Sequence, residues 1–120
     1  MRLADLRVSE RDGVVIARIN GEVDMSNAGE LKNALLRAIT NETLGVVIDL
    51  SEVAYLDSAA IHLLYELRDQ LKTRGQEIRL VVPSDAPVGD TLRLADVPAA
   101  VSIASGVEAA IDEIERPPTN

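Results

Sequence analysis

Residues 46–61, with the sequence VVIDLSEVAYLDSAAI, decide the fold of this chain. They join an apolar run, Val46 to Leu50, to an Asp57-Ser58 pair, and a long amphipathic segment follows. This run, in which Asp49 is the one polar residue, predicts a strand of the type that is buried on both faces. The amphipathic segment, from about Ala59 to Thr73, predicts a helix that buries one stripe of side chains. The pair therefore lies where a loop becomes a helix, and Ser58 is predicted to be the N-cap residue.

A serine at the start of a helix suits two purposes. Its hydroxyl can cap the exposed backbone N–H groups, which is worth on the order of 1 kcal/mol. It can also face solvent at the positive end of the helix dipole, where a phosphate carrying about −1.5 to −2 charge is accommodated without unfolding the helix. The local pattern alone favours the cap and leaves phosphorylation of Ser58 open.

The sequence before this stretch predicts a β-hairpin followed by a helix. Leu3–Val8 and Val14–Ile19 are expected to be strands, because both are rich in apolar residues and Asp12-Gly13 between them marks a turn. Leucines at helical spacing predict a helix over residues 27–40, with Ser26 as its N-cap.

The sequence after residue 61 alternates helices and strands. Gly75 is expected to end the helix that starts near Ala59. Beyond it we predict a strand, a short helix, an edge strand and a final helix, at Ile78–Val82, Val88–Ala95, Val101–Ile103 and Gly106–Glu115. This order predicts an α/β fold: a mixed, mostly parallel sheet, opened by an N-terminal β-hairpin, with about four helices. Residues 1–116 are expected to form a single domain, and residues 117–120 a disordered tail.

The composition limits the classes of partner. The 120 residues include no Cys, Phe or Trp, so the core must consist of Val, Ile, Leu and Ala, and Tyr55 and Tyr65 are expected to pack rather than bind. A net charge of −8 argues against nucleic acid or an anionic membrane and favours a basic groove on another protein. Neither a secretory signal nor an apolar run of bilayer length is visible, so we expect a cytoplasmic protein without membrane insertion.

Three acids and one histidine are candidates for chemistry near Ser58. Asp24 is expected beside Asp57, because each follows one of two neighbouring strands. Asp49 could join them as a metal ligand, but three scattered acids are a weak signal and no metal site is predicted. His62 could serve a hydrolase as a base for Ser58, yet no G-x-S-x-G elbow is present, and an exposed surface histidine is favoured. The glycines form no nucleotide-binding motif, so no cofactor is predicted.

With these elements in place, the chain resembles a known family. Residues 21–24, GEVD, and residues 49–58, DLSEVAYLDS, are similar to the motifs of a STAS domain of the anti-sigma factor antagonist (anti-anti-sigma factor) type. The resemblance extends from about Leu6 to Ile114, and it implies the STAS fold for nearly the whole chain.

The resemblance also implies a function, which is partner switching without catalysis by the chain itself. In this family the serine directly after the motif aspartate, here Ser58, is the phosphoacceptor. The unphosphorylated antagonist binds an anti-sigma factor that is also a serine kinase, and so frees the sigma factor. Phosphorylation dissolves the complex, and a PP2C-type phosphatase restores it. The residues then expected to contact the partner are Asp24, Asp57, Ser58, Ala59, Ala60, Ile61 and His62.

This chain departs from the family pattern in two places. The family usually continues Asp-Ser-Ser/Thr-Gly, whereas Ala59 and Ala60 follow Ser58 here. Ser58 is then the sole local hydroxyl, and the loop has less backbone freedom. A glycine that is usual near the end of the third helix is replaced by Asp96, a residue that tolerates a left-handed backbone at some cost.

Other functional classes fit less well. A receiver domain needs an acidic pair after its first strand and a lysine late in the chain, but the lysines are Lys32 and Lys72. A small hydrolase that uses Ser58 lacks a triad. A STAS subunit that is never phosphorylated, and that scaffolds a signalling complex or regulates a transporter ATPase partner, stays open as an alternative.

Overall fold

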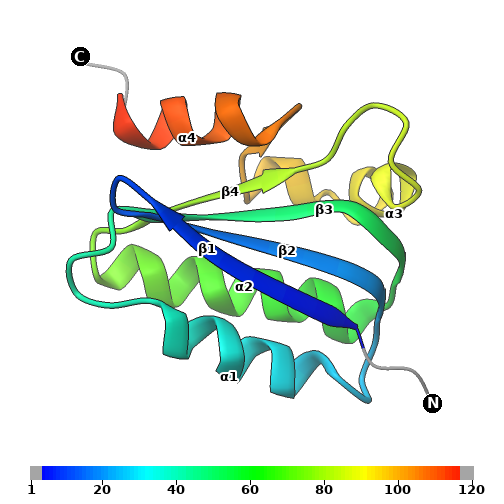
Figure 1. Ribbon diagram of the computed structural model, residues 1–120. Helices are drawn as coiled ribbons and strands as arrows, with labels where there is room; N and C mark the ends of the chain where they lie inside the picture. The colour runs from blue at the N-terminus through cyan, green and yellow to red at the C-terminus, as the bar shows by residue number, and fades with distance from the viewer. Residues whose placement is uncertain (1–3, 117–120) are drawn as a thin grey trace.

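The computed structural model describes residues 4–116 and shows one sheet between two layers of helices. The expected α/β fold is confirmed, because α1 and α2 cover one face of the sheet and α4 lies on the other (Figure 1). In chain order the elements are β1 (Asp5–Arg11), β2 (Val14–Val23), α1 (Ala28–Ala38), β3 (Gly45–Leu56), α2 (Ser58–Thr73), β4 (Glu77–Val81), α3 (Gly89–Leu94), the 3-10 turn η1 (Val97–Ala99), β5 (Ile103–Ala104) and α4 (Val107–Glu115). The tail predicted at residues 117–120 lies outside the described residues.

The five strands lie in the sheet in the same order as in the chain, β1-β2-β3-β4-β5. β1 and β2 pair antiparallel, and the other pairings are parallel. Asp12 and Gly13 close the hairpin with φ angles of 53° and 85°, which make a two-residue type I′ turn. The predicted mixed sheet and its opening hairpin are therefore confirmed, with the turn at the predicted dipeptide.

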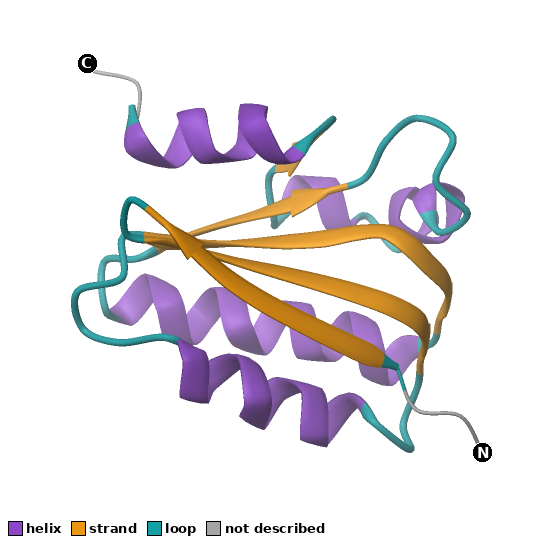
Figure 2. Cartoon of the chain, in the orientation of Figure 1, coloured by secondary structure: helices purple, strands orange, loops and turns teal. Residues whose placement is uncertain are grey.

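The core consists of two apolar layers on either side of β2 and β3. They lie between the sheet and the helices that Figure 2 shows on its two faces. Residues 14–17 of β2 are each at most 5% exposed, because alternate side chains enter the layers on opposite faces. The larger layer lies under α1 and α2 and includes Leu35 and Leu67, and the smaller lies under α4 and includes Ile111. The buried residues of both layers are Val, Ile, Leu and Ala, as the composition predicts.

β2 and β3 are longer than predicted. The sequence predicts that they end at Ile19 and Leu50, yet they stay paired as far as Val23 and Leu56. Two register shifts interrupt this pairing, and Gly21 lies at one of them with φ 113°, a conformation that suits glycine. Such irregularities disrupt the alternation of apolar and polar residues, so the extension is not readable from the pattern. The segments that carry the predicted site therefore start directly at the end of the sheet.

The last third of the chain differs from prediction in detail. The short helix predicted at Val88–Ala95 is present as α3, and the turn η1 that follows it was not predicted. Asp96, between α3 and η1, has φ 60°, so the left-handed backbone expected where the family has glycine is confirmed. β5 lies at Ile103–Ala104 instead of Val101–Ile103, because the N–H of Val101 donates to the carbonyl of Val97 at 2.9 Å and so belongs to the turn that η1 begins.

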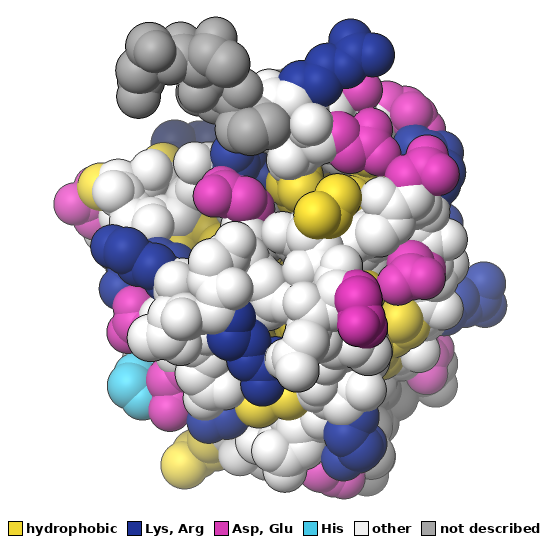
Figure 3. Space-filling view, turned by 90° about the vertical axis from the view of Figure 1, so that its left-hand side faces the viewer, with side chains coloured by type: hydrophobic (Ala, Val, Ile, Leu, Met, Phe, Trp, Pro, Cys, Tyr) yellow, Lys and Arg dark blue, Asp and Glu magenta, His cyan; other side chains and the backbone are white. Residues whose placement is uncertain are grey.

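The surface carries mixed charge at the end of the molecule formed by the β1–β2 turn. Figure 3 views that end, where acidic and basic side chains are interspersed and hydrophobic side chains show only as small patches. Among residues 4–116, no helix combines the length and the apolar character needed to cross a bilayer.

Candidate functional site

The segments that follow β2 and β3 meet at one end of the sheet, because neighbouring parallel strands end at the same edge (Figure 1). One segment carries Asp24 and leads into α1, and the other carries Asp57 and leads into α2. The N–H of Asp57 donates to the carbonyl of Val23 at 3.2 Å. The expected proximity of Asp24 and Asp57 is therefore confirmed.

Asp57, and not Ser58, is the N-cap of α2, which corrects the prediction. Its Oδ1 accepts the N–H of Ala60 at 3.0 Å, and its backbone is extended. Its Oδ2 accepts the N–H of Met25, in the segment before α1, also at 3.0 Å. One carboxylate thus caps α2 and ties the two segments together. An Asp-Ser pair offers two capping side chains, and the end of β3, which the sequence does not mark, decides between them.

Asp24 organises the segment before α1. Its carboxylate accepts hydrogen bonds from the hydroxyl and the N–H of Ser26, and its own N–H donates to the side chain of Asn27 at 3.0 Å. The two bonds from Ser26, that of the hydroxyl first, hold the pKa of Asp24 below its ordinary value. Asn27, instead of the predicted Ser26, occupies the N-cap position of α1, but its buried side chain bonds to Asp24 and Glu22 rather than to the helix.

Ser58 is the first residue of α2, and its side chain is exposed. Within residues 4–116 its hydroxyl takes part in no hydrogen bond, because Asp57 supplies the cap. Because Ser58 is at the first position of this 16-residue helix, it lies at the positive end of the helix dipole. Ser58 is therefore an accessible hydroxyl on a backbone that Asp57 fixes.

The three residues after Ser58 divide between surface and core. Ala59 and Ile61 are half-buried, and both pack against the larger core layer. Ala60 is 1% exposed, so its side chain cannot touch a partner, which corrects its expected place in the contact surface. Its contribution is the N–H that Asp57 accepts.

His62 is directed away from Ser58. Its side chain is 73% exposed, and its Nε2 lies 3.7 Å from Oε2 of Glu66 one helical turn later. Lys32 of α1 reaches the same carboxylate oxygen at 3.3 Å. The expected exposed histidine is confirmed, and the contact between Ser58 and His62 that a hydrolase would need is not formed.

A hollow between α1 and α2 opens beside the start of α2, and the sequence did not predict it. Its volume is about 230 Å³. The lining residues are Met25, Ala28, Gly29, Lys32, Ala59, His62, Leu63 and Glu66. Met25 is 83% exposed, and methionine is an adaptable apolar contact. The sequence held one signal of this hollow: Met25 is an apolar residue directly after Asp24, in a segment that is otherwise polar.

The two tyrosines differ in exposure. Tyr55 is 50% exposed near the end of β3, three residues before Ser58 in the chain, so the expectation that it packs is wrong. Tyr65 is half-buried on the flank of α2, as expected, with the guanidinium of Arg68 5.3 Å from its ring centre.

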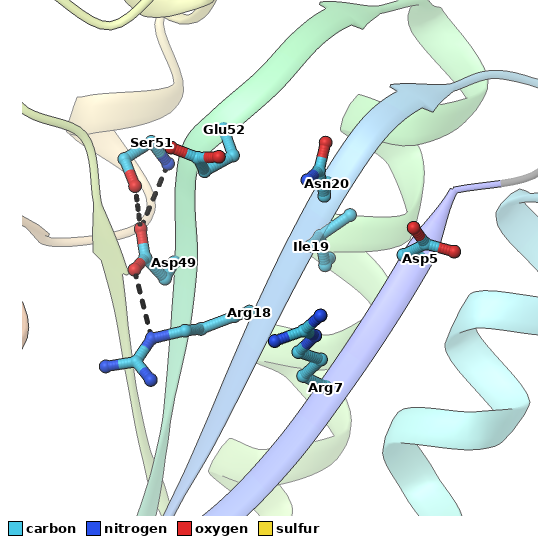
Figure 4. Close-up of a pocket in the computed structure, with 8 residues that line it drawn as sticks. All are labelled: Asp5, Arg7, Arg18, Ile19, Asn20, Asp49, Ser51 and Glu52. Carbon is cyan, nitrogen blue, oxygen red and sulfur yellow. Dashed lines mark hydrogen bonds and ion pairs between the residues drawn. The ribbon is translucent and has the colours of Figure 1, made fainter.

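Asp49 lies apart from this site, in a second hollow of about 440 Å³ on the sheet face that α4 leaves open (Figure 4). There it accepts the N–H and hydroxyl of Ser51 and lies 3.6 Å from Nε of Arg18. About 25 Å of extended strand separates it from Asp57. Asp49 therefore does not join Asp24 and Asp57, and residues 4–116 contain no group of three or more His, Cys, Asp or Glu placed to hold a metal ion.

One family model matches this chain, and its relatives of known sequence include an anti-sigma factor antagonist and a probable sulfate transporter. The model of the STAS domain matches residues 5–110. The anti-sigma-F factor antagonist RsfB of Mycobacterium tuberculosis is 29% identical over 75 residues, which are 62% of this chain and 59% of RsfB. The probable sulfate transporter 4.2 of Arabidopsis thaliana is 29% identical over 85 residues, which are 61% of this chain and 13% of the transporter. The chain thus spans less than two thirds of either relative.

Solved structures share the fold. The crystal structure of an anti-sigma factor antagonist from Mycobacterium paratuberculosis matches with a TM-score of 0.83 and 22% identity, over 94% of this chain and 95% of that one. At this identity the likeness concerns the fold alone.

Proposed function

Because this chain belongs to the STAS domain family, we propose that it is an anti-sigma factor antagonist that binds an anti-sigma factor which is also a serine kinase. Binding requires unphosphorylated Ser58 and frees the sigma factor. Phosphorylation of Ser58 by the partner dissolves the complex, and a PP2C-type phosphatase restores it. In this proposal the protein acts in the cytoplasm, catalyses no reaction, and needs neither metal nor cofactor.

The observation that carries the proposal is the exposed hydroxyl of Ser58 at the first position of α2. A kinase must reach its acceptor hydroxyl, and a hydroxyl that caps a helix is less available because it is already hydrogen-bonded. Here Asp57 provides the cap, so modification of Ser58 leaves the start of the helix intact. The added phosphate then acts at the surface, where it alters the fit to a partner.

The surroundings of Ser58 supply a contact surface of mixed character. Met25 and Tyr55 contribute exposed apolar groups, and His62 an exposed polar one. Asp24 and Asp57 place carboxylates beside them, and the net charge of −8 favours a partner with a basic groove. A phosphate on Ser58 would add about −1.5 to −2 charge to this already acidic edge.

The second candidate function keeps the fold without the switch. Ala59 and Ala60 stand where the family usually has Ser/Thr and Gly, and one relative is a probable sulfate transporter. A scaffold in a signalling complex, or a regulatory subunit of a transporter ATPase, would use the same surface and would need no phosphate on Ser58.

Incubation with a cognate anti-sigma factor kinase and ATP, followed by intact mass measurement and site mapping, tests the proposal. We expect a single phosphate on Ser58 and none in Ser58→Ala. Binding of the kinase should be retained by Ser58→Ala and lost in Ser58→Asp. Asn41→Asp is the matched control, because it adds the same charge at an exposed position at the other end of the fold. If wild type and Ser58→Asp bind equally and no phosphate reaches Ser58, the switch is wrong and the scaffold is favoured.

A further inference from the structure

β1 is an edge strand with an open side. It is the outermost strand of the sheet (Figure 1). It pairs with β2 over all seven of its residues and contains no proline and no bulge. Only Leu6 is half-buried; the other six residues are exposed, including Val8 at 46%. Proteins usually protect such edges with proline, bulges or charged side chains, because the unpaired backbone groups are a template for another strand. Of these devices β1 carries only charges, at Asp5, Arg7, Glu10 and Arg11, so a second strand must set each of them opposite an uncharged or oppositely charged residue.

The hairpin turn determines which backbone groups of β1 face outward. Arg11 and Val14 flank the two-residue turn, so they form a pair that exchanges both hydrogen bonds. Because such pairs alternate along an antiparallel ladder, the backbone groups of Leu6, Val8 and Glu10 are directed away from β2. The free edge therefore offers three residues in register for a further strand.

We propose that β1 pairs antiparallel with β1 of a second copy of this chain, centred on Val8, so that the two sheets join into one. The two-fold axis that relates two antiparallel edge strands must be perpendicular to the sheet. It therefore sets each residue opposite a residue of the other copy whose side chain lies on the same face of the joined sheet. Centred on Val8, the axis brings all three outward-facing residues into hydrogen-bonded pairs. Registers centred nearer either end of β1 pair fewer residues.

Charge selects the same register. Centred on Val8, Asp5 of each copy lies opposite Arg11 of the other, and Arg7 lies opposite the neutral Ser9. Centred on Arg7, the axis would set the two Arg7 side chains opposite each other. Centred on Ser9, it would set Arg7 opposite Arg11. The Val8 register is thus the one that combines full pairing with opposite charges and no like charges directly opposed.

The contacts on both faces of β1 fit this arrangement. On the α1 face, the two Val8 side chains cover each other, and Glu10 of the second copy lies opposite Leu6, beside the hollow of about 320 Å³ that Arg37 helps to line. On the other face, Arg11 bonds to Glu108 at 2.8 Å, and its guanidinium has further N–H donors for Asp5 of the second copy. The pairing strand does not include the segments that carry Asp57 and Ser58.

Edge pairing through one strand buries a small interface, so we expect a weak, concentration-dependent dimer. Sedimentation equilibrium should show an average mass that rises with concentration from 12.9 kDa toward twice that value. A chain that stays monomeric at millimolar concentration would overturn the proposal.

Two sets of variants identify the surface. Val8→Pro removes an outward N–H without touching the ladder to β2, so it should abolish the dimer while circular dichroism and urea unfolding remain those of a folded protein. Asp5→Arg and Arg11→Asp should each weaken the dimer by about tenfold, since each sets like charges opposite. The double variant Asp5→Arg/Arg11→Asp restores opposite charges and should recover the dimer. A double variant as weak as the single ones, or a dimer that survives Val8→Pro, would contradict the proposed pairing.

Discussion

The carboxylate of Asp57 accepts a hydrogen bond from the backbone N–H of Met25 at 3.0 Å, across 32 positions of the sequence. The other oxygen of the same carboxylate caps α2. A single side chain therefore fixes the first turn of α2 relative to the segment before α1. Ser58 is the next residue, so its position on the surface depends on this bridge.

Asp57→Ala removes both hydrogen bonds of the bridge. We expect it to lower the free energy of unfolding by about 1–2 kcal/mol, because a helix cap and a second bond between the segments are lost. Urea unfolding followed by circular dichroism measures the difference. Asp57→Asn is the matched control, since its amide oxygen keeps one acceptor, and it should lose less. Equal losses in the two variants would contradict a role for two separate acceptors.

Ser26→Ala removes the larger cause of the lowered pKa of Asp24, the hydroxyl hydrogen bond, and keeps the backbone bond. We expect the pKa of Asp24 to rise toward 3.8, its ordinary value, in an NMR titration of its carboxyl carbon. A carboxyl group whose pKa is lower in the folded state stabilises the fold at any pH above its ordinary, unfolded-state pKa. That stabilisation is lost as the pH falls through the folded-state pKa. Wild type and Ser26→Ala should therefore differ most near neutral pH and converge in acid. An unchanged titration of Asp24 would contradict this cause.

Gly45→Ala tests the close packing at the start of β3. A Cβ at Gly45 would lie 2.8 Å from the carbonyl oxygen of Glu77 and 2.9 Å from Cγ2 of Ile114. We expect a loss of about 1–3 kcal/mol in the free energy of unfolding, because strand and helix must both shift. Gly29→Ala is the control, since its Cβ would meet no atom within 4 Å and alanine favours the helix. Thermal unfolding should show opposite signs for the two variants.

Asp96→Gly tests the cost of a left-handed backbone on a residue with a side chain. Asp96 has φ 60° and ψ 28°, which glycine adopts without a steric penalty. We expect the variant to gain about 0.5–1 kcal/mol in the free energy of unfolding, and Asp96→Ala to lose stability, since alanine lacks a side chain that bonds locally. Urea unfolding of both variants is the measurement. A lower free energy of unfolding in Asp96→Gly would mean that the carboxylate of Asp96 stabilises the fold by more than its left-handed backbone destabilises it.

The local patterns of the sequence predicted the elements that bury strong apolar runs. Val14–Ile19 and Val46–Leu50 read clearly as buried strands because, Arg18 and Asp49 excepted, their side chains are apolar and buried on both faces. The dipeptide Asp12-Gly13 read as the turn because both positions need a positive φ, which few residues adopt. The position of the candidate site could be predicted from these two strands, since neighbouring parallel strands end at the same edge of the sheet.

The parts that could not be predicted depend on contacts between distant segments. The cap on α2 is Asp57 because β3 stays paired with β2 as far as Leu56, and no local signal marks that end. The contact of Asp57 with Met25 needs two segments that only the finished sheet brings together. The resemblance set Ala60 among the contact residues beside Ser58, whereas the helical spacing places it on the apolar stripe of α2 with Leu64, and this stripe is buried.

The order of the strands in the sheet also bears on how the chain folds during synthesis. Because β1 to β5 are neighbours in the order in which the ribosome releases them, each new strand finds its pairing edge already exposed. No strand has to insert between two others that have already paired. The face that α4 covers is the exception, since Val47 and Val81 stay in water until the last helix has emerged. A nascent chain stalled before Val107 would therefore present this apolar face to chaperones.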